Sequence, residues 1–141
     1  VVALAFIALA ATRLRAPAAR PACRAATVAR RPVLPFAALA AWVLVLDTRG
    51  VNVWCAAGKN LFSHDELALR VQRTGLERVV RHRRLILPQL AATGVSARQV
   101  KKKCGFEVVW GPVRARDIHD FLRNGMKAEQ AMRRVTFTFS F

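Results

Sequence analysis

Short apolar runs alternate with segments that carry helix-capping signals, and this alternation constrains the fold more than any other feature of the chain. The runs cover residues 42–46, 84–87 and 106–110, and a further one at 135–139 follows the last helical segment. Each has the length of an ordinary strand, and the first is continuously apolar, as expected for a strand covered on both faces. The runs therefore predict strands buried in a sheet.

The segments between the runs predict helices with defined ends. Ser63 with Glu66, and Ser96 with Gln99, form capping boxes, in which the serine accepts an amide hydrogen bond at the start of a helix. A third helix is predicted to begin at Asp117. Glycines close the three segments, at positions 75, 105 and 125. This alternation predicts an α/β fold, a Rossmann-like and mainly parallel sheet with flanking helices, whose ligands bind at the carboxyl ends of the strands.

Composition divides the chain near residue 41. Residues 1–41 are rich in Ala, Arg and Pro and contain no Lys, Asp or Glu, whereas all eight acidic residues lie between Asp47 and Glu129. The opening apolar run is shorter than the ~20 residues that span a bilayer, and its arginines follow it, unlike those of a secretory signal. The tail of a truncated membrane helix and translation outside the true reading frame both fit. We favour the second, assign residues 1–41 no function, and place one domain at 42–141.

The net charge of +16 is of the kind found in nucleic-acid-binding proteins. The basic clusters, however, lie at Arg81, Arg83 and Arg84 and at residues 101–103, without the aromatic residues on which bases stack. We interpret both clusters as solvated surface and predict no nucleic-acid partner.

The three cysteines, Cys23, Cys55 and Cys104, are widely spaced and odd in number. This pattern does not fit a disulfide framework and suits a reducing compartment. Three thiolates also cannot supply the four ligands of an ordinary iron–sulfur cluster, so no iron–sulfur cluster is expected in this chain.

The segment from Asn52 to Lys59 places one cysteine among small residues soon after the first apolar run. A phosphate-binding loop of the Walker type would need Gly at position 53 and Ser or Thr at position 60, where this chain has Val53 and Asn60. The nucleotide-binding interpretation therefore fails at two positions.

A histidine ligand to cobalt, of the kind found in an Asp-x-His-x-x-Gly sequence, also lacks support. Asp117 and His119 begin this pattern, but Leu122 stands where it needs Gly, and the residues fall within a predicted helix. Cys55 by itself would most often be a buried thiol that packs as a small hydrophobe.

The full segment resembles the cobalt-binding motif of the corrinoid protein of bacterial mercury methylation. That family is related to the corrinoid subunits of CO dehydrogenase/acetyl-CoA synthase. The resemblance extends from about residue 42 to 138 and includes residues 44–48, 65–67, 82–90, 111–115 and 132–138. It implies a corrinoid cofactor of the cobalamin type, with the Cys55 thiolate as catalytic residue and as cobalt ligand. The implied cofactor-binding residues are Asn52, Val53, Trp54, Cys55, Ala56, Ala57, Gly58 and Lys59.

The family passes a methyl group from the corrinoid to Hg(II), giving methylmercury. A thiolate is a soft, strongly donating ligand, and it would stabilise the oxidised cobalt that remains when methyl leaves for an electrophile. The small residues Ala56, Ala57 and Gly58 are expected to let the backbone approach the face of the corrin ring.

The resemblance also implies partners and a location. It implies a ferredoxin-like iron–sulfur protein that reduces cobalt, and a methyl-donor protein or the methyl-folate pathway. Membrane helices after the cofactor domain hold the family at the cytoplasmic face of the inner membrane. This chain contains no Tyr, lacks the family's Tyr- and Asn-containing segment, and ends at Phe141. We therefore expect a fragment whose corrinoid domain is incomplete and which lacks the anchor.

One alternative stays open. Corrinoid methyl carriers of the acetyl-CoA pathway share the cofactor and pass its methyl group to a low-molecular-weight or protein acceptor. They carry cluster-binding cysteines and lack a cysteine on cobalt, and Cys55 in its full motif favours the mercury interpretation.

Overall fold

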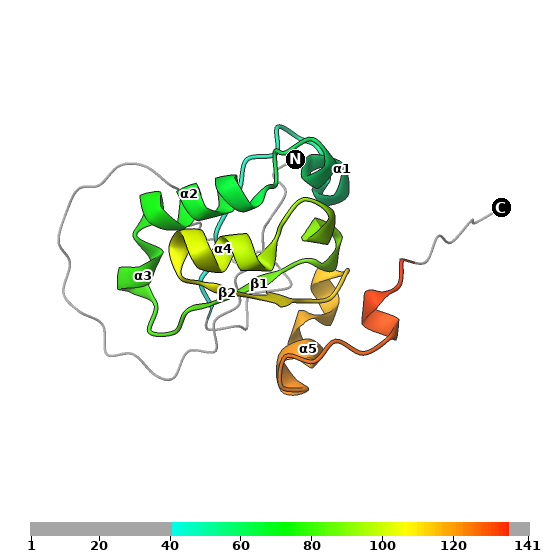
Figure 1. Cartoon of the computed structure of the whole chain (residues 1–141). Coiled ribbons are helices and arrows are strands. Elements are labelled where there is room, and N and C mark those ends of the chain that lie inside the picture. Colours follow the sequence, from blue (N-terminus) through cyan, green and yellow to red (C-terminus); the bar gives the residue numbers. More distant parts are fainter. Residues whose placement is uncertain (1–40, 136–141) are drawn as a thin grey trace.

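Two short parallel strands form the centre of the structure, a computed structural model that describes residues 41–135 (Figure 1). β1 (Arg84–Leu87) pairs with β2 (Glu107–Trp110) in a register that joins Arg84 to Glu107 and Leu87 to Trp110. Helix α4 (Ala97–Cys104) connects them. The prediction of a parallel α/β arrangement is confirmed in this coarse form, while a wider Rossmann-like sheet stays a prediction.

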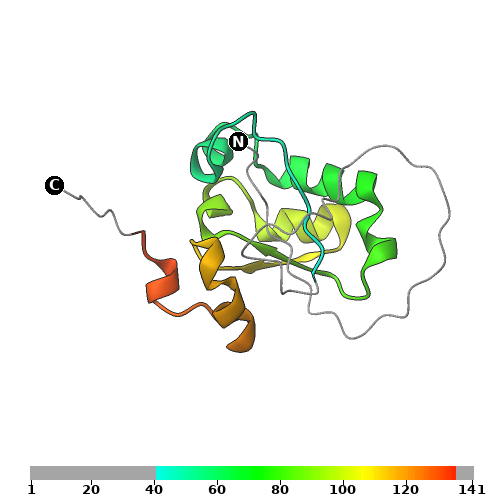
Figure 2. The same cartoon turned by 180° about the vertical axis from the view of Figure 1, so that it is seen from behind.

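Successive side chains of each strand pack into two apolar clusters on opposite faces of the sheet, because side chains alternate between the faces of a strand. Leu85 and Leu87 belong to the larger cluster, together with residues of α4 and of α2 (His64–Thr74). Ile86 packs with Phe121 of α5 (Ile118–Arg123) in the smaller cluster. Both views accordingly show α2 and α4 on one side of the strands and α5 on the other (Figures 1 and 2).

The serines of the two predicted capping boxes cap α2 and α4, as predicted. The Ser63 side chain accepts a hydrogen bond from the Glu66 amide at 3.3 Å, and the Ser96 side chain accepts one from the Gln99 amide at 3.4 Å. Both helices end at a glycine in the left-handed conformation, Gly75 and Gly105, with φ of 59° and 75°. A further short helix, α3 (Leu76–Val79), follows α2 directly and was not predicted.

Short 3-10 turns connect the remaining elements. η2 (Gln89–Thr93) follows β1, η3 (Ala115–Asp117) follows β2, and η4 (Ala131–Arg133) comes after α5. Asp117 is the cap residue of α5, at the predicted position, but its side chain makes no cap hydrogen bond. Asp117 ends η3 with helical backbone angles, whereas a capping side chain needs the extended conformation that precedes a helix.

The predicted strand at 42–46 is also wrong. Only Val45 takes part in a bridge, although Leu44 and Leu46 are fully buried in the larger cluster. An apolar run reports burial, and burial does not by itself require a ladder of strand hydrogen bonds.

Two expectations lie wholly or largely outside the described range. The strand at 135–139 falls on residues beyond 135, and residues 1–40 are not described, so the division of the chain near residue 41 stays a prediction. Within residues 41–135, no helix has the length and apolar character needed to cross a membrane.

Candidate functional site

A tight turn leads into the segment that contains Cys55. The Val51 amide donates to the Thr48 carbonyl at 3.1 Å, and the Thr48 hydroxyl donates to the Val51 carbonyl at 2.7 Å. The two residues between them, Arg49 and Gly50, have φ of 53° and 79°, as in the type I′ turn. Because Thr48 is fully buried and both of its bonds close the turn, the turn fixes the direction in which the chain leaves the core.

Helix α1 (Val53–Gly58) begins immediately after this turn, and Asn52 is its cap. The Asn52 side-chain oxygen accepts a hydrogen bond from the Cys55 amide at 2.9 Å. The Asn52 carbonyl accepts the Ala56 amide at 2.8 Å. Asn52 therefore holds the backbone of Cys55 directly.

The inner face of α1 is pressed against η2. Ala56 and Ala57 are buried in the larger cluster. A Cβ atom on Gly94 would lie 2.5 Å from the Ala57 carbonyl oxygen and 2.8 Å from that of Phe62. Contact this close needs small residues on both sides. The structure thus gives Ala56 and Ala57 a packing role in the core, and of the three small residues only Gly58 lies on the exposed side.

The outer face of α1 carries the remaining residues of the motif. Trp54 is 60% exposed, and Cys55 is half-buried. Gly58 and Lys59 are exposed, and a Cβ added at Gly58 would meet nothing within 4 Å. Residues three and four apart share one side of a helix, so the Cys55 thiol, the Trp54 ring and the open backbone at Gly58 border one surface.

The position of α1 agrees with the rule for parallel sheets. η2 follows the carboxyl end of β1 after Pro88, and α1 packs on η2. Ligands of parallel α/β proteins bind at this end of the strands. The motif therefore lies near the carboxyl end of β1, although the run at 42–46 that precedes it in the sequence is not a strand.

The second described cysteine has a different environment. Cys104 ends α4, and its thiol donates to the Val100 carbonyl at 3.2 Å. Burial raises the pKa of the Cys104 thiol, which favours its protonated form. Cys55 is thus the better placed of the two for ligand chemistry. Among residues 41–135, no group of three or more His, Cys, Asp or Glu residues is arranged to hold a metal ion.

Comparison with known proteins assigns the chain to a family. The family described as CO dehydrogenase/acetyl-CoA synthase delta subunit matches residues 34–122, more than half of the chain. The chain belongs to this family. The matched range contains α1, both strands and α4, and therefore the whole surface around Cys55.

Two curated relatives carry the same kind of name. The chain is 32% identical over 83 residues to acetyl-CoA decarbonylase/synthase complex subunit gamma of Methanocaldococcus jannaschii, covering 59% of this chain and 17% of the relative. It is 32% identical over 72 residues to the subunit of the same name from Archaeoglobus fulgidus, covering 51% and 15%. The chain thus spans about a sixth of the length of these relatives.

The matches confirm the expected relation to the acetyl-CoA pathway. They lend no support to mercury methylation in particular, and both relatives are named as subunits of a complex.

Two supporting residues were not identified from the sequence. Thr48 was noted only within a segment of resemblance, and Gly94 was not noted at all. A Thr-Arg-Gly-Val turn is a local signal that could have been recognised from its glycine. The contact of Gly94 with α1 joins segments more than thirty residues apart, and no local pattern reports it.

Proposed function

We propose that this chain is the corrinoid-binding part of a methyl-carrying subunit of the acetyl-CoA pathway type, and that it differs from the usual carriers of that pathway in using a thiolate, that of Cys55, as a ligand of cobalt. The observation that supports it most is the outer face of α1, where a half-buried thiol adjoins the unobstructed backbone at Gly58. Membership of the delta subunit family supports the pathway.

The residues of this face fit a corrinoid. A flat macrocycle needs an open surface, which Gly58 provides, and an apolar side chain beside it, which Trp54 provides. One soft donor from the protein would be sufficient, because the ring would itself supply four nitrogen ligands to the cobalt. The Cys55 thiol is exposed enough to reach such a group and buried enough to limit competition from water.

A bound corrinoid supplies a cobalt ion that can accept and release a methyl group. The residues of the chain hold and tune it. Cys55 loses its proton when its sulfur coordinates, since metal ions bind the thiolate and not the thiol. Asn52 anchors the Cys55 amide and so fixes where the sulfur projects. Lys59, at the end of α1, would meet polar groups at the edge of the ring if a corrinoid bound on this face.

Hg(II) is a second candidate for the methyl acceptor, and Cys55 itself favours it. A thiolate donates more electron density than a nitrogen ligand and stabilises oxidised cobalt, which suits transfer to an electrophile. The named relatives favour a protein or low-molecular-weight acceptor within the acetyl-CoA pathway. Both functions call for a separate iron–sulfur reductant and a methyl donor as partners.

Spectroscopic titration of the full chain with aquocobalamin tests the ligand. We expect the visible spectrum of the wild type to change on binding, and the Cys55→Ala variant to lose this change. Cys104→Ala is the matched control and is expected to behave as the wild type. Identical spectra for wild type and Cys55→Ala would rule out thiolate ligation.

To identify the methyl acceptor, the chain is loaded with methylcobalamin and supplied either with Hg(II) or with a methyl acceptor of the acetyl-CoA pathway. If the wild type forms methylmercury and Cys55→Ala forms less of it, Hg(II) is favoured as the acceptor. Methyl transfer only to an acetyl-CoA synthase preparation would favour the acetyl-CoA pathway.

A further inference from the structure

Two groups of exposed basic residues, separate in the sequence, meet at the amino ends of the strands. One group precedes β1, and the other lies in the last turn of α4, just before β2. The Arg83 carbonyl accepts the Glu107 amide at 2.7 Å, and Cζ of Arg83 lies 5.4 Å from the centre of the Phe106 ring. These contacts join the two groups into one surface. We call it the basic end, and its residues are Arg81, Arg83, Arg84, Lys101, Lys102 and Lys103.

Only two of these six residues have a carboxylate partner in the described part of the chain. Lys101 Nζ lies 2.7 Å from a carboxylate oxygen of Glu107, and Lys103 Nζ lies 2.6 Å from one of Asp65. Arg84 stands opposite Glu107 in the strand register, but it forms no ion pair with it. The basic end therefore carries more positive charge than its surroundings neutralise.

The rest of the chain has no acidic side chain to cover this surface. All eight acidic residues lie between Asp47 and Glu129, within the described range. Residues 1–40 contain arginine but no Asp or Glu, and residues 136–141 contain no charged side chain. Carboxylates that pair with the remaining cations must come from another molecule.

The fold itself accounts for part of the charge. The three lysines lie in the last turn of α4, where the helix dipole favours cations. Arg83 donates to the carbonyl oxygens of Glu77 and Val80 at the end of α3. The side chains of Arg81 and Arg84 have no such role in the structure, although gathering like charges on one surface is electrostatically unfavourable.

The basic end lies at the opposite end of the strands from α1. β1 starts at Arg84, η2 follows its carboxyl end, and α1 packs on η2. Both views show α3 and the end of α4 on the side of the molecule away from α1 (Figures 1 and 2). A partner held at the basic end would therefore leave the surface around Cys55 open.

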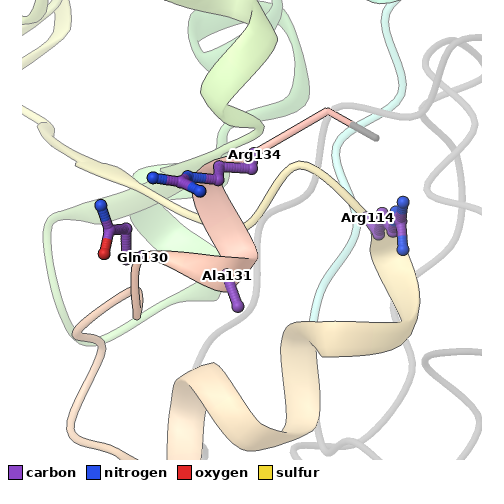
Figure 3. A pocket seen from close by; sticks show the side chains of 4 residues that line it. All are labelled: Arg114, Gln130, Ala131 and Arg134. Carbon is purple, nitrogen blue, oxygen red and sulfur yellow. The ribbon is translucent and has the colours of Figure 1, made fainter. Parts of the chain in front are cut away.

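The cations near η4 do not converge in this way. A pocket of about 420 Å³ lies there, and Arg114, Gln130, Ala131 and Arg134 line it. The Arg114 side chain lies apart from those of Arg134 and Gln130 (Figure 3). The two arginines therefore do not form a joint binding surface.

We propose that the basic end is a docking surface for an acidic protein, whose carboxylates pair with Arg81, Arg84 and Lys102. Opposite charges across an interface speed encounter and fix the register of the partners. The surface is of mixed sign, because the exposed residues Glu77 and Glu107 lie among the cations. A protein can place a cation opposite each of them, whereas DNA and anionic membranes present only negative charge.

The uncharged residues of this surface also suit a protein. Val79, two residues before Arg81, is 39% exposed and offers an apolar contact of the kind found within protein interfaces. Phe106, the aromatic residue beneath Arg83, is fully buried and presents no ring on which a base could stack.

Two triple variants of the full chain remove the same charge from different surfaces. The basic-end variant combines Arg81→Gln, Arg84→Gln and Lys102→Gln. The control variant combines Lys127→Gln, Arg133→Gln and Arg134→Gln, all at exposed positions after α5. Because the net charge of the two variants is identical, a difference between them reports the location of binding.

Three anionic probes are compared at the same salt concentration: a glutamate-rich peptide, a DNA duplex, and phosphatidylcholine vesicles that contain phosphatidylglycerol. The basic-end variant is expected to bind the peptide about tenfold more weakly than the control variant, because it loses three ion pairs that each contribute modestly at an exposed surface. Added salt should reduce the difference, since it screens exposed charges.

Equal affinities of the two variants for the peptide would overturn the proposal. A larger difference for DNA or for vesicles than for the peptide would also overturn it, and would make a nucleic acid or a membrane the occupant. If circular dichroism shows that the basic-end variant is unfolded, Lys102→Glu and Lys127→Glu replace the two variants, since each changes one exposed position.

The result is independent of the proposed function. Aquocobalamin should give the same spectral change with the basic-end variant as with the wild type. A chain that binds no corrinoid, but binds the peptide through the basic end, would keep the docking surface and remove the corrinoid. A spectrum that depends on Cys55, with no difference between the variants for the peptide, would do the reverse.

Discussion

The two described thiols differ in what surrounds the sulfur. Cys104 is half-buried at the end of α4, donates to the Val100 carbonyl, and has a pKa raised chiefly by burial. Cys55 is on the outer face of a short helix, beside an exposed tryptophan and an open glycine. Since the thiolate is the reactive form, the two residues should differ in rate toward alkylating reagents.

Alkylation with iodoacetamide at pH 7.5, followed by peptide mass mapping, is expected to modify Cys55 several-fold faster than Cys104. Raising the pH should increase the Cys104 rate, because its elevated pKa leaves little thiolate near neutrality. Equal rates for the two peptides in the native chain, or a faster Cys104, would contradict the exposure that the structure gives Cys55. The same digest in denaturant provides the control, where the two rates should converge.

His82 predicts a pH dependence of stability. Burial, followed by the charge of Arg84, lowers the pKa of His82 below its ordinary value of 6.5, and its Nδ1 accepts the Arg84 amide at 3.3 Å. The folded chain thus binds fewer protons here than the unfolded chain. This contribution to stability is present above pH 6.5 and is lost as the pH falls through the lowered pKa.

Urea unfolding at intervals between pH 7.5 and pH 5 measures this effect. The free energy of unfolding of the wild type is expected to decrease toward pH 5. His82→Asn keeps a side-chain acceptor but does not titrate, so its curve should be flatter over this range. Parallel curves would show that another group is responsible. Asp65 and Glu107, whose pKa values are lowered by Lys103 and Lys101, contribute only at lower pH.

Among individual residues, sequence reasoning performed best where the chemistry is local. Ser63 and Ser96 were predicted as caps, because a hydroxyl three residues before an amide is sufficient to form the bond. The prediction of a side-chain cap bond from Asp117 was wrong, since this bond depends on backbone angles that the preceding 3-10 turn sets.

At the level of elements, α1 shows why a six-residue helix needs outside support. Isolated helices of this length are unstable in water, because nucleation costs more than the few hydrogen bonds return. α1 is held by the Asn52 cap, by burial of Ala56 and Ala57, and by the close contact with Gly94. The helix was missed from the sequence because these supports are mostly tertiary.

Gly94→Ala and Gly58→Ala form a matched pair that tests this support. The new methyl at position 94 would collide with backbone atoms of α1, and overpacking of this kind costs about 1–3 kcal/mol. At position 58 it would meet open space, and alanine should stabilise the helix by up to about 1 kcal/mol. Chemical denaturation measures both. Equal effects on the free energy of unfolding would refute the packing of α1 on η2.

The Gly58→Ala variant also separates folding from binding. If a corrin ring packs on this face, the added methyl should weaken aquocobalamin binding even though the free chain is at least as stable as the wild type. An unchanged affinity would place the ring elsewhere.

At the level of the whole molecule, the sheet joins two apolar clusters of unequal size. The larger cluster contains Phe106 and the smaller contains Phe121, and both side chains are fully buried. The same two strands contribute residues to both clusters, so one cluster cannot lose its packing without disturbing the backbone that supports the other.

Phe106→Ala and Phe121→Ala are therefore each expected to lower the stability of the whole described region in one transition, by about 3–5 kcal/mol. Leu69→Ala is the control, since Leu69 is 38% exposed and a surface change of this kind typically alters stability by at most about 0.5 kcal/mol. Circular dichroism and tryptophan fluorescence should give coincident curves. Separate transitions in Phe121→Ala would mean that α5 and η4 unfold independently of the sheet.

The overall class of the fold was accessible from the sequence, whereas its extent was not. Periodic burial and capping signals located β1, β2, α2 and α4, since these depend on neighbouring residues. The apolar run at 42–46 carried the same signal as the strands but packs without a ladder, because pairing depends on a partner that periodicity cannot identify. The resemblance at residues 52–59 indicated the candidate site from the sequence alone.

The exposure of Trp54 gives the molecule an optical probe of its own. Trp42 and Trp110 are partly buried against the larger cluster, whereas Trp54 is mostly in solvent one residue from Cys55. Solvent shifts indole emission to longer wavelengths, so the red edge of the emission spectrum reports mainly on the outer face of α1. A coloured ligand that binds there will quench this edge of the spectrum first.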